Sequence, residues 1–150
     1  MEVQKDFRDL LALFSKHKVD FIIVGAYALG FHGVPRYTGD LDVLVRPDTT
    51  NGDNIMAALN EFGFGGVGLS PSDFEKEGKV VQLGFPPIRV DILTSITGVS
   101  WQQAESGSAA GRFGDLMVKY LGRLEFVTNK RALGRKKDIA DLEAIGEDYP

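Results

Sequence analysis

The stretch that decides the fold is VGAYALGFHGVPRYTGDLDVLV, residues 24–45. It begins at the end of an apolar run, turns at Gly25, and reaches Asp40-Leu41-Asp42 at the start of a second apolar run. Side chains of a β-strand alternate between its two faces, so Asp40 and Asp42 point the same way. Two like charges surrounded by apolar residues repel each other unless a partner group or a metal ion neutralises them.

A third aspartate, Asp91, lies in another strand-like run, residues 89–93. Three carboxylates on adjacent strands suit Mg²⁺, or Mn²⁺ in its place, because hard cations prefer oxygen ligands and usually bind substrate phosphates as well. We therefore predict a metal site made of Asp40, Asp42 and Asp91. Taken alone, an Asp-x-Asp pair is often a solvated strand edge. The apolar strand around it and the third aspartate favour the metal.

The composition is that of an ordinary globular chain, and its 150 residues predict a single domain, 1–150. The absence of cysteine excludes disulfides and thiolate metal sites, and two histidines are too few for a histidine-based zinc site. The N-terminus does not resemble a signal peptide, and the apolar stretch 21–31 is too short to span a bilayer. We expect a cytoplasmic protein without membrane association.

Hydrophobic periodicity and turn residues predict alternating helices and strands. Helices are expected at 5–16, 26–33, 51–62, 99–105, 122–133 and 137–146, strands at 21–24, 40–46 and 114–120, a β-hairpin at 80–83 and 89–93, and loops or flexible segments at 63–78 and 106–111. Asp48 or Thr49 is expected to cap the helix at 51–62, and Gly134 to separate the last two helices.

Two further groups of residues are candidates for binding phosphates. The turn at Gly25 offers backbone N–H groups to an anion, although many such glycines serve only the turn. Arg36 and Thr38 precede the aspartates and are predicted to face the same cleft.

The C-terminal third is basic although the net charge is −4. Lys130 and one of Lys136 and Lys137 are candidates for contacts with a triphosphate. The alternative is a solvated helix pair, in which i,i+4 acidic residues offset the basic ones; those partners would be Asp138, Asp141 and Glu143.

Taken in sequence order, the turn at Gly25-Ala26, the pair Asp40 and Asp42, and Asp91 resemble the pattern of the nucleotidyltransferase superfamily, which has the polymerase-β-like fold. That family has a strand, a Gly-Gly or Gly-Ser turn, a short helix, an Asp-x-Asp/Glu on the next strand and a third acidic residue on a later one. The chain is most similar to small bacterial nucleotidyltransferases related to abortive-infection toxins. Their front motif resembles residues 24–45, and their tail resembles NKRALGRKKDIADLEAI, residues 129–145. Residues 63–78 and 106–118 have no counterpart in the resemblance.

The resemblance implies an α/β domain with a mixed sheet, helices mainly on one face and a helical C-terminal end. It also implies transfer of a nucleoside monophosphate from an NTP to an acceptor hydroxyl, with release of pyrophosphate. Asp40 and Asp42 would hold Mg²⁺ and through it the triphosphate, and Asp91 would complete a second metal and help to deprotonate the acceptor. The phosphate contacts would come from Gly25, Ala26, Arg36, Thr38, Lys130 and Lys137. Ala26 departs from the family pattern, because it lacks the serine hydroxyl of a Gly-Ser turn.

Several questions stay open at this stage. The acceptor is a tRNA end, a protein or a small molecule such as an antibiotic, and the role is related to toxin–antitoxin systems or to resistance. Candidate protein partners are an antitoxin and a second copy of the chain. One rival is a catalytically silent nucleotide-binding or antitoxin-like protein, which Ala26 favours. Another is an RNA-binding module, which the pI of about 5.2 and the lack of an aromatic platform disfavour.

Overall fold

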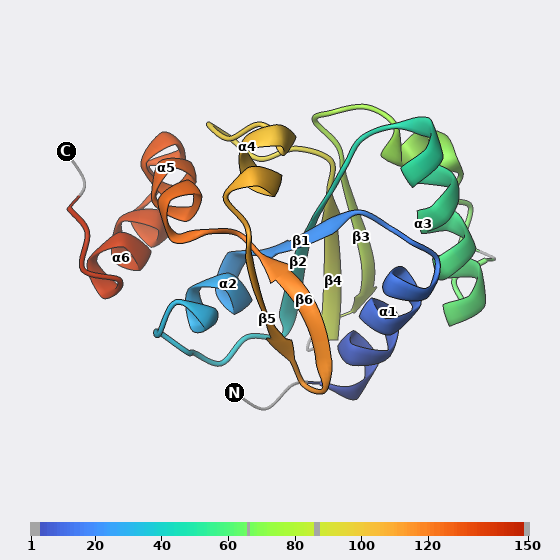
Figure 1. The fold of residues 1–150 in the computed structure, drawn as a ribbon, viewed down its shortest axis with the longest axis horizontal. Helices are drawn as coiled ribbons and strands as arrows, with labels where there is room; N and C mark the ends of the chain where they lie inside the picture. The colour runs from blue at the N-terminus through green and yellow to red at the C-terminus, as the bar shows by residue number, and fades with distance from the viewer. Residues whose placement is uncertain (1–3, 66, 86–87, 149–150) are drawn as a thin grey trace.

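A six-stranded mixed sheet forms the centre of the computed structural model, which describes residues 4–65, 67–85 and 88–148 (Figure 1). The strands lie in the order β3-β4-β2-β1-β6-β5. β1 runs antiparallel to β2, whereas β2 and β4, and likewise β1 and β6, are parallel. The bounds are Phe21–Val24 (β1), Asp40–Val45 (β2), Val80–Phe85 (β3), Ile88–Leu93 (β4), Ala109–Phe113 (β5) and Leu116–Tyr120 (β6). The strands on either side of residues 25–39 therefore form the middle of the sheet.

Four of the helices form two pairs beside this sheet. In Figure 1, α1 and α3 lie to its right and α5 and α6 to its left, and the members of each pair are in contact. The bounds are Lys5–Lys16 (α1), Gly25–Phe31 (α2), Thr49–Phe62 (α3), Trp101–Ser106 (α4), Arg123–Leu133 (α5) and Lys136–Ala144 (α6). The α/β architecture, the mixed sheet and the helical C-terminal end are confirmed.

The two faces of the central strands differ in character. Leu41 and Val43 of β2 are fully buried, and the matching residues of β4 are buried as well. Helix α1 covers this apolar face, where the ring of Phe14 packs edge-on against Phe21 with 5.5 Å between centroids. The opposite face carries the two aspartates of β2, which are only partly buried. The packing of α1 thus leaves the polar face of β2 and β4 available for a site.

Strand β5 is the main difference from the elements predicted from sequence, because the pattern at 106–111 predicts a flexible segment. Alanine and glycine have low strand propensity, and pairing with β6 holds this edge strand in place. Gly111 lets Phe31 of α2 approach, since a Cβ there would lie 2.3 Å from the ring. Phe31 in turn stacks on Tyr120 with 4.4 Å between centroids. The glycine therefore marks a close contact rather than a flexible segment.

Other predicted bounds shift by a few residues. The loop predicted at 63–78 contains a 3-10 turn, Pro71–Phe74, which buries Phe74. The hairpin strands are longer than predicted, so Gly84 belongs to β3, and the predicted loop residues 86–87 lie outside the described residues. The side chain of Asp48 caps α3 by accepting the N–H of Asn51 at 2.7 Å. Within the described ranges, no helix is long and apolar enough to cross a membrane.

Candidate active site

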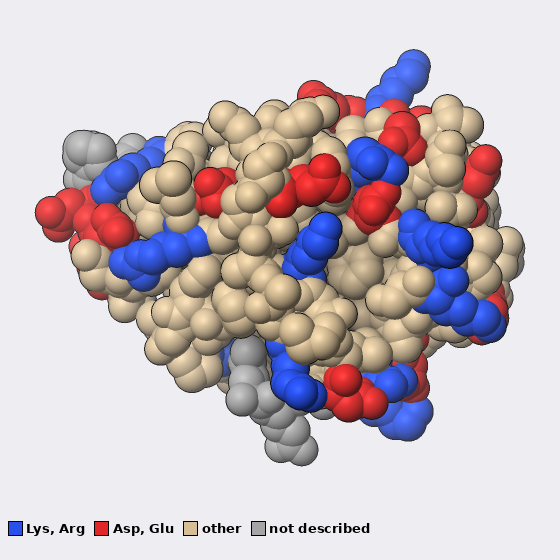
Figure 2. Space-filling view, in the orientation of Figure 1, with Lys and Arg blue, Asp and Glu red and all other residues tan. Residues whose placement is uncertain are grey.

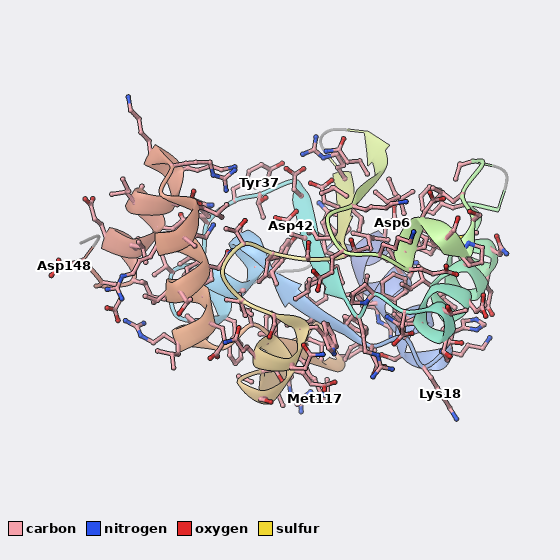
Figure 3. The ribbon with its side chains drawn as sticks, turned by 90° about the horizontal axis from the view of Figure 1, so that it is seen from above. Asp6, Lys18, Tyr37, Asp42, Met117 and Asp148 are labelled. Carbon is pink, nitrogen blue, oxygen red and sulfur yellow. The ribbon has the colours of Figure 1, made fainter. Side chains whose placement is uncertain are left out.

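The three predicted aspartates lie on adjacent strands and on the same face of the sheet. In the parallel β2–β4 pair, Asp42 stands directly opposite Asp91, and Asp40 stands opposite Arg89. Matching positions of paired strands point the same way, so Asp91 projects from the face that carries Asp40 and Asp42. Seen from above, Asp42 lies in the middle of the molecule, between the C-terminal helices and α3 (Figure 3). The fold thus brings together the acidic residues singled out in the sequence.

Gly25 lies against the carboxylate of Asp42. It follows β1 with a φ of +66°, a left-handed conformation that glycine adopts readily. A Cβ at this position would lie only 2.3 Å from Oδ2 of Asp42. Any larger residue would therefore push the carboxylate away. Glycine is required here for this contact as well as for the turn, a reason that the sequence pattern does not reveal.

Burial and repulsion disfavour the ionised form of Asp42. Loss of solvation is the main cause, and the charges of Asp91 and Asp40 add to it, so the pKa of Asp42 is raised to about 6. The nearby ammonium group of Lys130 opposes this shift. Burial also raises the pKa of Asp91, although Arg89 acts against it. At neutral pH the site therefore holds close carboxylates whose charges are only partly compensated.

Arg89 belongs to this cluster although the sequence did not single it out. Its Nη2 donates to Oδ2 of Asp40 at 3.2 Å, and its Nε lies 3.3 Å from Oδ1 of Asp91. One arginine thus contacts two of the three carboxylates. The signal was present in the spacing, because Arg89 is two residues before Asp91 and must share its face of β4.

Lys130 is buried at the junction of α5 and α6, with 8% of its surface exposed. Its Nζ lies 3.3 Å from Oδ1 of Asp138 and 3.2 Å from Oδ2 of Asp141, and 5.3 Å from the ring centroid of Phe126. It is also close enough to Asp42 to lower that pKa. The C-terminal helices therefore place one buried positive charge, that of Lys130, near the acidic site.

The two aspartates around Lys130 correct part of the solvated-helix interpretation. Asp138 and Asp141 are 0% and 3% exposed, so they are internal partners and not surface ones. Burial would raise the pKa of Asp138, but hydrogen bonds from Arg135 and the charge of Lys130 outweigh it and lower that pKa. The face of the molecule in Figure 2 shows acidic and basic side chains interspersed among uncharged ones. No broad basic surface is visible there that would suit a nucleic acid.

The remaining predicted phosphate contacts are less directly connected to the aspartates. Arg36 is exposed, and its Nη1 donates to Oδ1 of Asp141 at 2.9 Å. The hydroxyl of Thr38 accepts the backbone N–H of Asp40 at 3.1 Å and thereby fixes the start of β2. Lys137 is exposed on α6 and, among the described residues, forms no ion pair within 4.0 Å. Arg36 therefore reaches the site only through the Lys130 network, and the role of Lys137 stays a prediction.

The donor atoms fit a hard divalent cation, although the site is not preformed. Among residues 4–65, 67–85 and 88–148, no three acidic or histidine side chains are arranged closely enough to hold a metal ion as they stand. Oδ1 of Asp91 is nevertheless buried without a hydrogen bond, and such an acceptor suits a cation. Oxygen-only ligands from carboxylates are those that Mg²⁺ prefers. A metal would therefore require rearrangement of the cluster.

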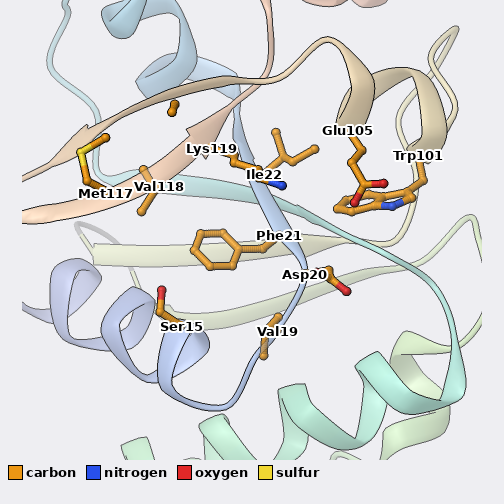
Figure 4. A pocket seen from close by; sticks show the side chains of 11 residues that line it. Ser15, Val19, Asp20, Phe21, Ile22, Trp101, Glu105, Met117, Val118 and Lys119 are labelled. Atoms are coloured by element: carbon orange, nitrogen blue, oxygen red, sulfur yellow. The ribbon is translucent and has the colours of Figure 1, made fainter.

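A separate hollow of about 310 Å³ opens between α4, β6 and the turn after α1 (Figure 4). Its walls are largely apolar, with Phe21, Trp101 and Met117 among them, and Glu105 and Lys119 bring charge to it. None of the predicted site residues lines it. The hollow is therefore distinct from the acidic site.

Comparisons with known proteins support the fold. No protein-family model and no curated sequence matches the chain. A candidate nucleotidyltransferase from Thermotoga maritima is similar in structure, with a TM-score of 0.57 and 15% identity over 91% of this chain and 88% of the other. A lincosamide antibiotic adenylyltransferase, LnuA, solved with lincomycin bound, is similar with a TM-score of 0.50 and 12% identity over 95% and 96%. The chain therefore has a nucleotidyltransferase-like fold.

The contact between Gly25 and Asp42 predicts a specific loss of stability. Gly25→Ala should destabilise the fold by more than about 2 kcal/mol, because the added methyl group meets the carboxylate and the backbone is strained. Gly33→Ala is the matched control, since its φ is +105° and, apart from its chain neighbours, no described residue comes within 4 Å of the place that a Cβ would occupy. Urea unfolding should give the larger loss at Gly25. Equal losses would mean that Asp42 moves aside freely.

The raised pKa of Asp42 predicts how stability depends on pH. The unfolded carboxyl titrates near about 3.9, so between about pH 6 and 4 the folded state binds more protons and this group increasingly favours folding as pH falls. Above about pH 6 the ionised carboxylate costs about 3 kcal/mol, because its pKa lies about two above the unfolded value. In EDTA at about pH 7.5, Asp42→Asn should therefore melt about 6–12 °C higher than the wild type. The gap should shrink toward about pH 4.5, and a gap independent of pH would contradict the assignment.

Proposed function

We propose that the protein is a Mg²⁺-dependent nucleotidyltransferase that moves a nucleoside monophosphate from an NTP to an acceptor hydroxyl, in the cytoplasm. The observation that carries the proposal is the grouping of Asp40, Asp42 and Asp91 on the open face of a nucleotidyltransferase-like sheet, beside the turn at Gly25. Partly buried carboxylates that repel one another are costly for the fold, and a bound cation would offset that repulsion.

In this proposal the aspartates bind the metal and activate the acceptor hydroxyl. Asp40, Asp42 and Asp91 would hold the metal, which when bound neutralises charge on the triphosphate and its leaving group. The acceptor oxygen attacks the α-phosphorus, a new P–O bond forms, and the bond from the α-phosphorus to the bridging oxygen breaks to release pyrophosphate. Asp91 would receive the proton of the acceptor hydroxyl, and the rise in its pKa on burial supports that role.

Other residues would bind the phosphates and orient the site. Gly25 and Ala26 belong to the turn that touches Asp42, and backbone N–H groups at such turns bind anions. Lys130 would stabilise negative charge on the phosphates, with Arg36 and Lys137 further out. Thr38 would keep Asp40 in position through its bond to the backbone N–H.

The acceptor and the biological role are the finer part of the proposal. A small molecule is one acceptor class, supported by the structural similarity to an antibiotic adenylyltransferase. A tRNA end and a protein side chain are the others, and a toxin role with an antitoxin partner or a homodimer accompanies them. A silent nucleotide-binding protein is the second candidate function, because Ala26 lacks a phosphate-binding hydroxyl and Arg89 contacts two of the carboxylates.

One experiment separates these alternatives. The protein is incubated with each α-labelled NTP, Mg²⁺ and cell extract, and the label is followed into RNA, protein and small molecules. The Asp42→Asn variant serves as the control for contaminating activities. Label in one fraction that depends on Asp42 names the acceptor class. Nucleotide binding without any transfer would favour the silent protein.

Nucleotide binding should depend on the metal and on Asp42. We expect an NTP to bind tightly with Mg²⁺ and scarcely in EDTA, because uncompensated carboxylates repel the triphosphate. Asp42→Asn should abolish the Mg²⁺-dependent part while the protein remains folded. Isothermal titration calorimetry on both proteins measures this directly. Equal NTP affinities of the wild type and Asp42→Asn in Mg²⁺ would contradict the metal assignment.

The tail lysines should act on the outer phosphates. Lys137→Ala should weaken binding of Mg·NTP several-fold while leaving AMP binding nearly unchanged, because AMP lacks those phosphates. Lys136→Ala, an equally exposed neighbour on α6, is the control and should have no effect. Lys130→Ala should weaken NTP binding more strongly and also lower the melting temperature, since it leaves Asp138 and Asp141 with one cation fewer. If Lys136 and Lys137 behave alike, the exposed part of the tail is a solvated face.

A further inference from the structure

Arg89 stands in contact with the carboxylates that would hold a metal ion. It lies directly across the β2–β4 pair from Asp40 and two residues before Asp91. Its guanidinium carries one positive charge against these two aspartates, at 3.2 and 3.3 Å. The arginine therefore supplies, within the chain itself, part of the compensation that a divalent cation would otherwise provide.

Arg89 and Asp91 attract each other electrostatically, but Nε of Arg89 and Oδ1 of Asp91 are not aligned for a hydrogen bond. Nε of Arg89 and Oδ1 of Asp91 are 3.3 Å apart, yet both atoms are buried without a hydrogen bond. A buried donor and acceptor that fail to pair cost free energy in the folded state. Arg89 keeps one hydrogen bond in the cluster, from Nη2 to Oδ2 of Asp40 at 3.2 Å. Departure of Arg89 would therefore break one hydrogen bond and free an Nε that has no partner.

The neighbouring strand β3 places no side chain directly opposite Arg89. In the antiparallel β3–β4 pair, Gly84 is the residue directly opposite Arg89. Directly opposite residues point to the same face, so most other residues at 84 would place a side chain beside the guanidinium. Gly84 also has a φ of +84°, a conformation that disfavours side chains. β3 is an edge strand, and a displaced arginine would extend over it toward solvent.

We propose that Arg89 is an exchangeable internal counter-cation, which holds Asp40 and Asp91 when no metal is bound and is displaced by the divalent cation. This inference rests on the metal site of the proposed function and adds its regulation. The arginine keeps the carboxylates from repelling one another in the free protein. It also competes with the metal, so the free protein binds divalent cations weakly. A purely structural ion pair would instead remain in place when a metal is added.

Metal binding without nucleotide tests the competition. The probe is Mn²⁺, followed by electron paramagnetic resonance of the free ion, on wild type, Arg89→Met and Arg8→Met. Methionine keeps an unbranched chain and removes the charge. Arg8 is the control because it also contacts two aspartates, Asp9 and Asp115, but lies on α1. We expect Arg89→Met to bind Mn²⁺ about tenfold more tightly or better, since one competing charge is lost, and Arg8→Met to match the wild type. Unchanged or weaker binding by Arg89→Met overturns the proposal.

Thermal stability gives a second readout that does not depend on catalysis. In EDTA, Arg89→Met should melt below the wild type because the aspartates lose their counter-charge. In millimolar Mg²⁺ this gap should close, since the metal takes over that role. A gap of the same size in both conditions would mean that Arg89 is structural, and the proposal would fail.

The wild type itself provides a measurement that needs no variant to fold. The Nε–Hε signal of Arg89 in a nitrogen-15 spectrum should shift and exchange faster with water as Mg²⁺ is added. A signal that stays unchanged while Mg²⁺ binds overturns the proposal. These tests contain no nucleotide, so they are separable from nucleotidyl transfer. An unmoved Arg89 in a protein that binds Mg·NTP refutes the counter-cation alone, and a displaced Arg89 in a protein that never transfers label refutes the enzyme alone.

Discussion

The placement of Asp42 is the constraint on which the rest of the site depends. Its carboxylate touches the backbone at Gly25, faces Asp91 across a parallel strand pair, and has lost much of its hydration. A carboxylate in that position requires a residue without a side chain beneath it and positive charge around it. The left-handed glycine after β1 meets the first requirement, and the buried lysine on α5 supplies positive charge near Asp42. The arginine on β4 offsets the neighbouring charges of Asp40 and Asp91. The site is thus organised around compensation of its carboxylates.

The C-terminal helices follow from the same constraint. A lysine buried near Asp42 would itself be costly if it were alone, because an ammonium group loses its hydration on burial. Asp138 and Asp141 on α6 satisfy it, and Arg36 reaches back from the loop before β2 to contact Asp141. Several charges of this region therefore pair with one another. This pairing explains how a basic tail belongs to an acidic protein, because aspartates within the fold match several of its cations.

Local sequence patterns predicted the parts of this structure that local physics determines. The strand at 21–24, the turn at Gly25 and the Gly134 break all have short-range signals and were identified correctly, and the strand predicted at 40–46 ends one residue earlier. Strand β5 lacked such a signal, because Gly111 is explained only by the distant Phe31. Arg89 and the burial of Asp138 were missed for a related reason. Their partners lie on other elements, and a charged side chain in a sequence looks the same whether it is solvated or paired.

The fold and the charges carry different weight in deciding between an active enzyme and a silent relative. At 15% and 12% identity, the similar structures establish the architecture and say nothing of chemistry in this chain. The charges of the acidic site bear more directly on the choice between an active enzyme and a silent protein. A protein that no longer binds a metal gains stability by losing Asp42, since its raised pKa marks an ionised state that the fold disfavours at neutral pH. All three carboxylates are nevertheless present, and the absence of a side chain at Gly25 leaves room for that of Asp42. A costly acidic cluster held by an imperfectly bonded arginine is what the proposed exchange of one cation for another would require.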